Sequence, residues 1–310
     1  MTTESRVVLV TGSSSGFGAL IVRTLALQGH RVFASMRAMA SSNAGAASEL
    51  RAWAEQNGAQ LDVVEMDVTS EASVNACVED VIARAGQIDV VVNNAGASAS
   101  GPIEAFSLLQ VEALYSLNVF GPLRVNKAVL PGMRQRRAGL LLHISSTLGR
   151  VLPGSGGLYP ATKWALEGLV ESLSYQAKAF GVDVVLLEPG SYPSPATGKA
   201  MQAEDHDIAA QYARAQALVV RPKGAPPDEG YRQPDPQEVA DAVARLIELP
   251  AGQRPLRSVV GHNFTEGVAD YNDAYEQTKA RLAQALLRPD QAMTWGPNAV
   301  PLPKRHNGVA

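Results

Sequence analysis

The chain has 310 residues, of which 46% are hydrophobic and 18% are charged, a composition typical of a globular protein with one large α/β domain or two small ones. Its net charge of -3 gives no reason to expect nucleic acid or an anionic membrane as a partner. Cys77 is the single cysteine, so no internal disulfide can form. This fits a reducing cytosol, and the cysteine is expected to be a small buried residue.

Three further classes of protein are not expected: metal-binding, membrane-spanning and secreted proteins. The five histidines show no metal-ligand spacing, so the sequence predicts no metal site. No apolar run approaches the roughly 18 residues that a membrane-spanning helix needs. The first residues lead straight into a strand, so we expect no secretory signal and a cytoplasmic location.

The first predicted element is a buried strand at residues 6–11, which are apolar and mostly β-branched. A glycine-rich turn follows, and then an amphipathic helix that reaches Leu27. A turn in this place presents backbone N–H groups and a helix N-terminus to a phosphate. A flexible loop would look similar, but its position between strand and helix favours a dinucleotide. The expected contacts are Gly12, Ser14, Ser15, Gly16, Phe17 and Gly18.

The second predicted strand, residues 31–37, bears on the choice of cofactor. A site for NAD has an acidic residue about 20 positions after the glycines, which binds the ribose 2′-hydroxyl. No acid lies between Arg31 and Asn43, and Arg37 stands at the end of the strand. An arginine there suits a 2′-phosphate, so NADP(H) is expected, the alternative being a plain surface arginine.

The remaining elements alternate along the chain. Strands are expected at residues 61–66, 88–93, 140–144, 182–188 and 258–261, and helices at about 50–56, 70–85, 107–129, 159 onward, 207–217, 237–249 and 268–287. Because no polar linker interrupts them before residue 190, they predict one α/β domain, a doubly wound parallel seven-stranded sheet with helices on both faces. The domain covers residues 1–287, with an irregular tail at 288–310. His143 is expected to be packed in its strand rather than catalytic.

Tyr159 and Lys163 are one turn apart at the start of a predicted helix, because Pro160 suits a first turn. A phenol has a pKa of about 10, and a nearby ammonium group favours the phenolate and lowers that pKa. The pair is therefore a candidate general acid/base. The alternative is an ordinary exposed pair on a helix.

Several short motifs together resemble one family. They are Thr11-Gly12-x-x-x-Gly16-x-Gly18, Asp67-Val68, Asn93-Asn94-Ala95-Gly96, Asn118, Ser146, Tyr159-x-x-x-Lys163 and Pro189-Gly190. Over about residues 5–285 the chain resembles the compact branch of the short-chain dehydrogenase/reductase family, which has a Rossmann-type fold. Residues 34–37 and 163–168 are similar to the 17β-hydroxysteroid dehydrogenase and retinol dehydrogenase group.

The resemblance implies roles for four catalytic residues. Tyr159 would donate a proton to a carbonyl oxygen as hydride arrives from the nicotinamide. Lys163 would lower the pKa of Tyr159 and bind the nicotinamide ribose. Ser146, favoured over Ser145 by the family spacing, would hold the carbonyl oxygen, and Asn118 would support a water-linked proton path to Lys163.

The resemblance also implies cofactor contacts. Asp67 and Val68 would meet the adenine, and Asn94, Ala95 and Gly96 would line its ribose, while Thr11 and Asn94 are expected mainly to brace two strand ends. After Pro189 and Gly190 the family usually has a small apolar residue and a threonine that contact the carboxamide and the diphosphate. Here these positions hold Tyr192 and Ser194. Ser194 can replace the hydroxyl, and Tyr192 can use its backbone, its ring being free to cover the substrate.

The expected function is an NADP(H)-dependent oxidoreductase that interconverts a ketone or aldehyde with an alcohol. Alternatives are a dehydratase or epimerase of the same family, or a non-catalytic NADPH-sensing scaffold.

The segment of residues 191–234 is too long for an ordinary connection. It suggests a lid over a bulky apolar substrate, the alternatives being a surface insertion or an oligomer contact. Family habit implies a homodimer or homotetramer through the helices of Asn118 and Tyr159.

Overall fold

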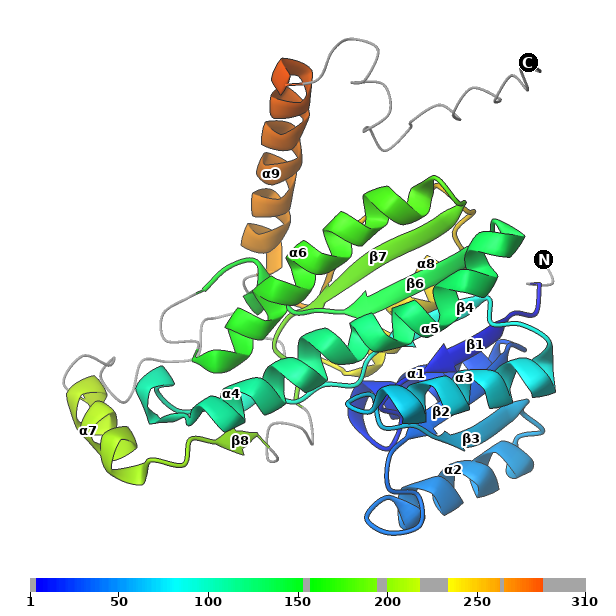
Figure 1. Ribbon diagram of the computed structural model, residues 1–310, viewed down its shortest axis with the longest axis horizontal. Helices are drawn as coiled ribbons and strands as arrows, with labels where there is room; N and C mark the ends of the chain where they lie inside the picture. The colour runs from blue at the N-terminus through cyan, green and yellow to red at the C-terminus, as the bar shows by residue number, and fades with distance from the viewer. Residues whose placement is uncertain (1–3, 153–156, 194–199, 218–233, 263–264, 287–310) are drawn as a thin grey trace, which may run out of the picture.

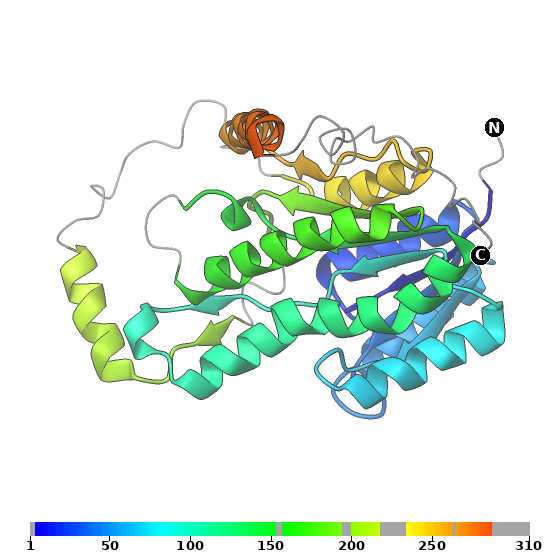
Figure 2. The same ribbon diagram turned by 45° about the horizontal axis from the view of Figure 1, so that its top comes forward.

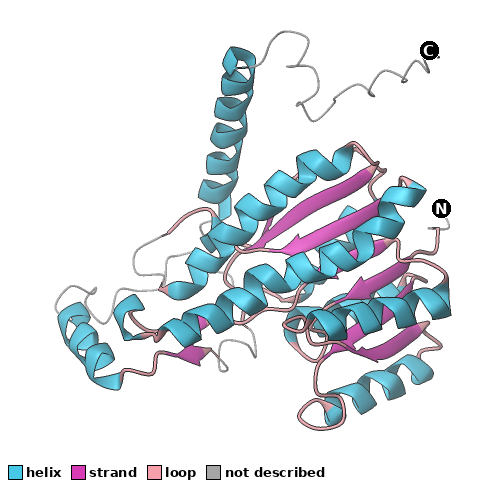
Figure 3. Ribbon diagram, viewed as in Figure 1, coloured by secondary structure: helices cyan, strands magenta, loops and turns pink. Residues whose placement is uncertain are grey.

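The computed structural model describes residues 4–152, 157–193, 200–217, 234–262 and 265–286. Within them, parallel strands form a seven-stranded sheet in the order β3-β2-β1-β4-β6-β7-β9 (Figures 1 and 3). The strands are β1 (Val7–Val10), β2 (Arg31–Met36), β3 (Leu61–Glu65), β4 (Val90–Asn93), β6 (Gly139–Ile144), β7 (Val182–Pro189) and β9 (Arg257–Val260). The predicted doubly wound parallel sheet is confirmed.

Two hydrophobic cores cover the two faces of the sheet, because successive strand residues point to opposite sides. Val8 and Val10 pack with the helices α1 (Gly16–Leu27), α2 (Ala44–Gln56) and α8 (Gln237–Glu248). Leu9, between them, packs with α3 (Glu71–Ala85), α5 (Gly121–Arg136) and α6 (Leu158–Lys178). Figure 1 shows α3, α5 and α6 in front of the sheet, with α1 and α8 behind it.

The strand order reverses beside β1, which pairs with β2 on one side and with β4 on the other. The chain leaves these strands in opposite directions, so a crevice forms at their carboxyl ends, where ligands bind in sheets of this type. The glycine-rich turn follows β1, and residues 94–96 follow β4. The topology therefore brings two of the predicted cofactor segments together.

Two helices extend beyond the sheet. α9 (Thr265–Leu286) packs on β9, bonds α6 through Tyr275 and Lys279, and projects from the body, whereas α7 (His206–Ala217) lies at one end of the molecule (Figures 1 and 2). A short parallel sheet, β5 (Ala99–Ser100) with β8 (Met201–Gln202), fastens the segment before α7 to the body. The predicted lid region thus has an anchored base, while residues 194–199, 218–233 and the tail at 288–310 lie outside the described residues.

Three helix boundaries differ from the sequence prediction. α2 begins at Ala44 rather than near Leu50, because alanines favour a helix and Ala47 packs in the core. The helix expected at 107–129 is divided into α4 (Leu108–Tyr115), a π-helical turn η2 (Ser116–Phe120) and α5. α5 continues through Pro131 to Arg136, since Met133 is fully buried against the sheet and offsets the lost backbone hydrogen bond.

Other local predictions can be compared directly. Cys77 and His143 are buried, as expected. Two single turns of 3₁₀ helix, η1 (Ile103–Ala105) and η3 (Thr147–Gly149), were not predicted. No helix among the described residues is long and apolar enough to cross a membrane. The same part of the chain contains no group of three His, Cys, Asp or Glu side chains arranged to hold a metal ion.

Candidate active site

The glycine-rich turn lies tightly against the loop after β4. Gly12 has a φ of +69°, and a Cβ atom there would lie 2.8 Å from Cα of Ala95. A Cβ atom on Gly18 would lie 2.6 Å from Nδ2 of Asn94. Ser15 precedes α1 without a side-chain capping bond, and the first turn of α1 holds no acidic residue. An uncapped helix N-terminus beside glycines is the cradle that a diphosphate needs.

Thr11 and Asn94 join the ends of β1 and β4. The Thr11 hydroxyl accepts hydrogen bonds from the backbone N–H groups of Asn94 and Ala95, both at 3.0 Å. The Asn94 amide donates to the carbonyl oxygens of Thr11 at 2.9 Å and Gly12 at 3.0 Å. The expected bracing role is confirmed, and it fixes the glycine-rich turn relative to residues 94–96.

Arg37 and Asp67 lie near each other at the ends of β2 and β3. Arg37 is exposed, and its guanidinium makes no ion pair with any described residue. Burial raises the pKa of Asp67, but hydrogen bonds from Thr69 and the charges of Arg37 and Arg124 outweigh it and lower that pKa. A cationic group therefore stands open at the edge where the sequence predicts a 2′-phosphate. Val68, the residue after Asp67, is buried.

Tyr159 and Ser146 meet where α6 begins and β6 ends. The Ser146 hydroxyl accepts a hydrogen bond of 3.1 Å from the backbone N–H of Leu148, and its own hydrogen is free to bond the Tyr159 oxygen. Burial raises the pKa of Tyr159 to about 12, although the bond with Ser146 acts against the rise. Tyr159 is thus protonated near neutral pH and suited to donate a proton.

Lys163 differs from the expected arrangement. Its ammonium group donates to the carbonyl oxygen of Ile144 at 2.8 Å and lies 5.7 Å from the centre of the Tyr159 ring. The expected net lowering of the pKa of Tyr159 is wrong, because burial of the phenol dominates. The part that Lys163 takes in favouring the phenolate stays a prediction. Burial also lowers the pKa of Lys163 to about 8, and the Glu167 carboxylate opposes that shift.

Asn118 lies in the π-helical turn with its side chain almost fully buried. Its amide nitrogen donates to the carbonyl oxygen of Ala97 at 2.9 Å and to the Thr162 hydroxyl at 3.0 Å, and its oxygen accepts from the Ala97 N–H at 2.9 Å. The side chain therefore joins the loop after β4 to α6. A role in a water-linked proton path remains a prediction.

Comparison with known proteins assigns the family. The model of the short chain dehydrogenase family matches residues 6–205. The chain belongs to this family. Human retinol dehydrogenase 8 is 38% identical over 203 residues, which are 64% of this chain and 63% of the relative. Rat estradiol 17-beta-dehydrogenase 1 is 38% identical over 61% of this chain and 54% of its own length. The chain thus spans less than two thirds of either relative.

A solved structure shows the same fold. The alcohol dehydrogenase of Thermococcus sibiricus, determined with 5-hydroxy-NADP, has a TM-score of 0.65 and is 28% identical, covering 83% of this chain and 96% of its own. The match agrees with the predicted membership of the short-chain dehydrogenases and with the predicted sheet.

Tyr192 is the clearest departure from the pattern of short-chain dehydrogenases. Its ring packs edge-on against Phe17, with centroids 5.6 Å apart, and its hydroxyl bonds Glu238 of α8 at 3.0 Å. A buried aromatic ring with a polar tip is satisfied here by both neighbours. A place for this ring over the substrate stays a prediction. Gly190 lies directly after β7, and Ser194 lies outside the described residues.

A cavity of about 370 Å³ opens beside the glycine-rich turn. Ser14, Ser15, Gly16 and Phe17 line it together with Glu49 of α2. Tyr159 is not among its lining residues. The cavity therefore lies beside the glycine-rich turn and does not include the candidate proton donor.

Two residues with a place at the site were missed by the sequence analysis. Glu65, at the end of β3, accepts hydrogen bonds from the backbone of Ala38 at 2.6 Å and Met39 at 2.9 Å, and so fixes the loop after Arg37. Glu167 lies one turn after Lys163 and is 2% exposed. The signal available for Glu167 was its i, i+4 spacing from Lys163.

Proposed function

We propose that this short-chain dehydrogenase is an NADP(H)-dependent oxidoreductase that interconverts a bulky apolar ketone or aldehyde with the corresponding alcohol. The observation that carries the proposal is the pairing of a protonated Tyr159 with the Ser146 hydroxyl, beside the buried Lys163. A ketone needs a proton donor and a second hydrogen bond to the developing alkoxide, and these two hydroxyls can supply them.

The choice of NADP(H) rests on the exposed guanidinium of Arg37, which makes no ion pair with a described residue, and on the absence of an acid between Arg31 and Asn43. The dinucleotide would lie along Gly12, Gly16 and residues 94–96, where the uncapped start of α1 faces the diphosphate. A nicotinamide cofactor bound there would supply the hydride. The NADP-type ligand of the Thermococcus structure supports the same choice.

The residues of the chain itself have distinct tasks in this reaction. Tyr159 gives its proton to the carbonyl oxygen, and Ser146 donates a hydrogen bond to the same atom, because its other partner, the Leu148 N–H, leaves its hydrogen free. Lys163, fixed on the Ile144 carbonyl, places a positive charge near the phenolate that Tyr159 becomes. Asn118 holds the loop at Ala97 in position.

An apolar substrate is supported by the surroundings and by the relatives. Ala105, Phe106, Leu114, Leu158 and Ala203 form an apolar cluster beneath the base of the lid region. Retinol and estradiol, the alcohols in the names of two relatives, are large and apolar. A mostly apolar lining with few polar groups favours such ligands.

A carbonyl panel with NADPH, followed by absorbance, tests the proposal. We expect polycyclic and long-chain carbonyl compounds to turn over and small polar ones to react poorly. Tyr159→Phe should lose at least 95% of kcat and still bind NADPH by fluorescence, since only the proton donor is removed. Tyr175→Phe, on the same helix, is the matched control and should stay active. Residual turnover above a few per cent in Tyr159→Phe would contradict the role of Tyr159.

A further inference from the structure

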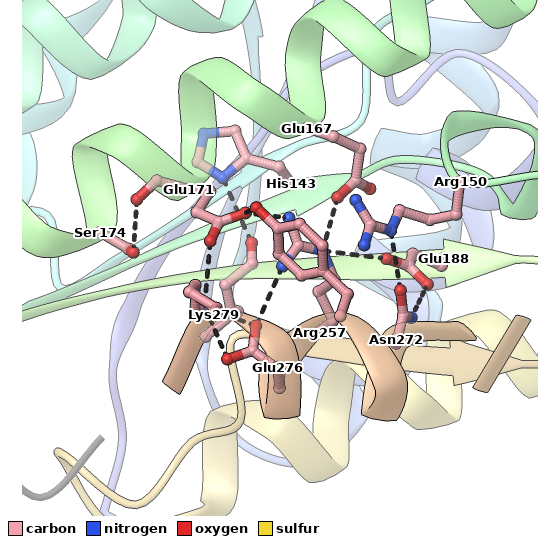
Figure 4. Close-up of polar contacts among 12 residues, drawn as sticks. His143, Arg150, Glu167, Glu171, Ser174, Glu188, Arg257, Asn272, Glu276 and Lys279 are labelled. Atoms are coloured by element: carbon pink, nitrogen blue, oxygen red, sulfur yellow. Dashed lines mark hydrogen bonds and ion pairs between the residues drawn. The ribbon is translucent and has the colours of Figure 1, made fainter. Parts of the chain in front are cut away.

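A cluster of buried charged and titratable groups packs around Glu167, which lies one helical turn after Lys163 on α6, and is not part of the proposed reaction (Figure 4). Arg257 of β9 is its centre and binds four carboxylates: Glu167 at 2.9 Å, Glu171 at 2.6 Å, Glu188 at 3.5 Å and the more exposed Glu276 at 3.4 Å. The side chains of Arg257, Glu167 and Glu188 are 5%, 2% and 0% exposed. We call Glu167, Glu171, Glu188 and Arg257 the Arg257 cluster.

Helix α9 holds this cluster from the outside. Lys279 binds Glu171 at 3.0 Å, and Asn272 donates to Glu188 at 2.7 Å and accepts from Arg150 at 2.7 Å (Figure 4). Burying a charged group costs free energy unless the charge is paired. These polar contacts therefore offset the desolvation penalty of the buried groups and need not raise the stability of the fold. The question is what the buried charges do.

Glu167 connects the cluster to Lys163. The two residues are one turn apart on α6 and are both buried. A Cβ atom on Gly149 would lie 3.1 Å from Cγ of Glu167 and 3.3 Å from Cβ of Lys163. Gly149 therefore packs directly against the aliphatic parts of both side chains. No residue with a side chain fits there without moving one of them.

The polar atoms around Glu167 are incompletely satisfied. Among the described residues, Oε1 of Glu167, Oε1 of Glu188, Nη2 of Arg150 and Oγ of Ser145 are buried without a hydrogen-bond partner. The titratable groups near Lys163 are Tyr159 on α6 and His143 on β6. Those around Glu167 and Arg257 are Glu171 on α6, and Tyr275, Glu276 and Lys279 on α9, of which Figure 4 labels Glu171, Glu276 and Lys279. The arrangement leaves one oxygen of Glu167 with no counter-ion of its own.

We propose that Glu167 is a positioning residue that keeps Lys163 in its ammonium form, and that Arg257 and α9 hold Glu167 in place for this role. The inference rests on the proposed function only in taking Lys163 as a catalytic residue. Burial lowers the pKa of Lys163 and the Glu167 carboxylate opposes that shift, and the two effects together give a pKa of about 8. Without the carboxylate, the ammonium would lose its proton near neutral pH.

Glu171 provides a matched control. It lies on the same helix and binds the same Arg257, but it is eight residues from Lys163, roughly 12 Å along the helix axis at about 1.5 Å per residue. A purely structural role of the cluster would make the Glu171→Gln and Glu167→Gln variants equivalent. A role in holding the charge of Lys163 makes them different.

The test is a pH titration of the protein without cofactor, labelled with ¹³C at the ε-carbon of lysine. The Lys163 resonance is assigned by its loss in Lys163→Met. Glu167→Gln should lower the pKa of Lys163 by about one unit, and Glu171→Gln by less than about 0.3 unit. Glu167→Asp, which keeps the charge, should restore the value to within about 0.3 unit of the unmutated protein.

Equal shifts in Glu167→Gln and Glu171→Gln, or no shift in Glu167→Gln, would overturn the inference. If Glu167→Gln does not fold, Glu167→Met removes the same charge and keeps an apolar side chain of similar length in the buried site, and the pKa of Lys163 should still fall. An unchanged value there would overturn it as well. Because the titration uses neither cofactor nor substrate, its failure leaves the proposed oxidoreductase reaction standing, and the failure of the carbonyl panel leaves this result standing.

Discussion

At the scale of single residues, burial sets the chemistry of this site more strongly than the neighbouring charges do. The pKa of Tyr159 rises to about 12 and that of Lys163 falls to about 8, so each group is pushed toward its neutral form. Both shifts have desolvation as their main cause. A sequence shows the i, i+4 spacing of the two side chains but not how deeply each lies, which is why the expected direction for Tyr159 was wrong.

Arg37 gives a prediction about cofactor choice. Arg37→Ala should weaken NADPH binding about 10- to 100-fold, because charge-assisted hydrogen bonds to a phosphate contribute about 1.5–3 kcal/mol. NADH has no 2′-phosphate, so its affinity should stay nearly unchanged. Fluorescence titrations with both cofactors measure this, and Arg51→Ala, an exposed arginine on α2, is the control. Equal affinities for NADPH and NADH in the unmutated protein would refute the assignment.

Gly149 gives a prediction about packing. A Cβ atom there would lie 3.0 Å from Oγ of Ser145 and 3.1 Å from Cγ of Glu167. Gly149→Ala should therefore lower the free energy of unfolding by about 1–3 kcal/mol and reduce kcat by displacing Lys163. Denaturant titration and turnover check both effects.

Gly168, on α6, is the matched control for Gly149. A Cβ atom on Gly168 meets nothing within 4 Å. Gly168→Ala should leave kcat unchanged and stabilise the protein by up to about 1 kcal/mol, because alanine favours a helix. A stable and fully active Gly149→Ala protein would show that the turn can move without disturbing Lys163.

At the scale of elements, the strands and most helices could be predicted from the spacing of apolar residues, because helices bury both faces of the sheet. Val8, Leu9 and Val10 supply both cores within one apolar run, as a central parallel strand must. The π-helical turn at Asn118 and the short β5–β8 sheet could not be predicted. A π-helical turn depends on the fit between α4, α5 and α6, and two-residue strands carry too few residues for a pattern.

The β5–β8 sheet leads to a prediction for the lid region. The backbone N–H groups of Met201 and Ala203 bond the carbonyl oxygens of Ser98 at 2.9 Å and Ser100 at 3.2 Å. We expect these amides to be protected from hydrogen exchange in the free protein, with protection of α7 rising on addition of NADPH and again with substrate. Identical exchange of α7 in all three states would contradict closure of a lid and favour a surface insertion.

At the scale of the whole molecule, buried titratable groups couple folding to pH. His143 lies in the centre of the sheet, where Nε2 faces the Asn126 amide at 2.9 Å and Nδ1 the Val185 carbonyl at 3.3 Å. Burial, opposed by the bond to Val185, lowers its pKa to about 4. The sequence could place His143 in a strand, but the depth of the strand and the asparagine partner come from the packing of α5 on β6.

The sign of the resulting pH dependence follows from this shift. The unfolded chain takes up the His143 proton near pH 6.5, whereas the folded protein does so only near pH 4. The stability contributed by the neutral ring is therefore complete above about pH 6.5 and is lost as the pH falls toward 4. Between pH 7.5 and 4.5 this residue should lower the free energy of unfolding by roughly 2–3 kcal/mol.

His143→Gln should remove that part of the pH dependence, whatever it does to the stability at pH 7.5. The measurement is the free energy of unfolding from denaturant titrations at several pH values, compared as slopes rather than as absolute values. His206→Gln is the control, because His206 is exposed on α7 and its ring stays in water when the chain folds. Glu171, whose pKa is held at about 2 by Arg257 and Lys279 in spite of burial, loses its contribution mainly at lower pH and so does not mask the effect. If the slopes of His143→Gln and the unmutated protein coincide between pH 7.5 and 4.5, the ring of His143 takes up its proton without unfolding the sheet.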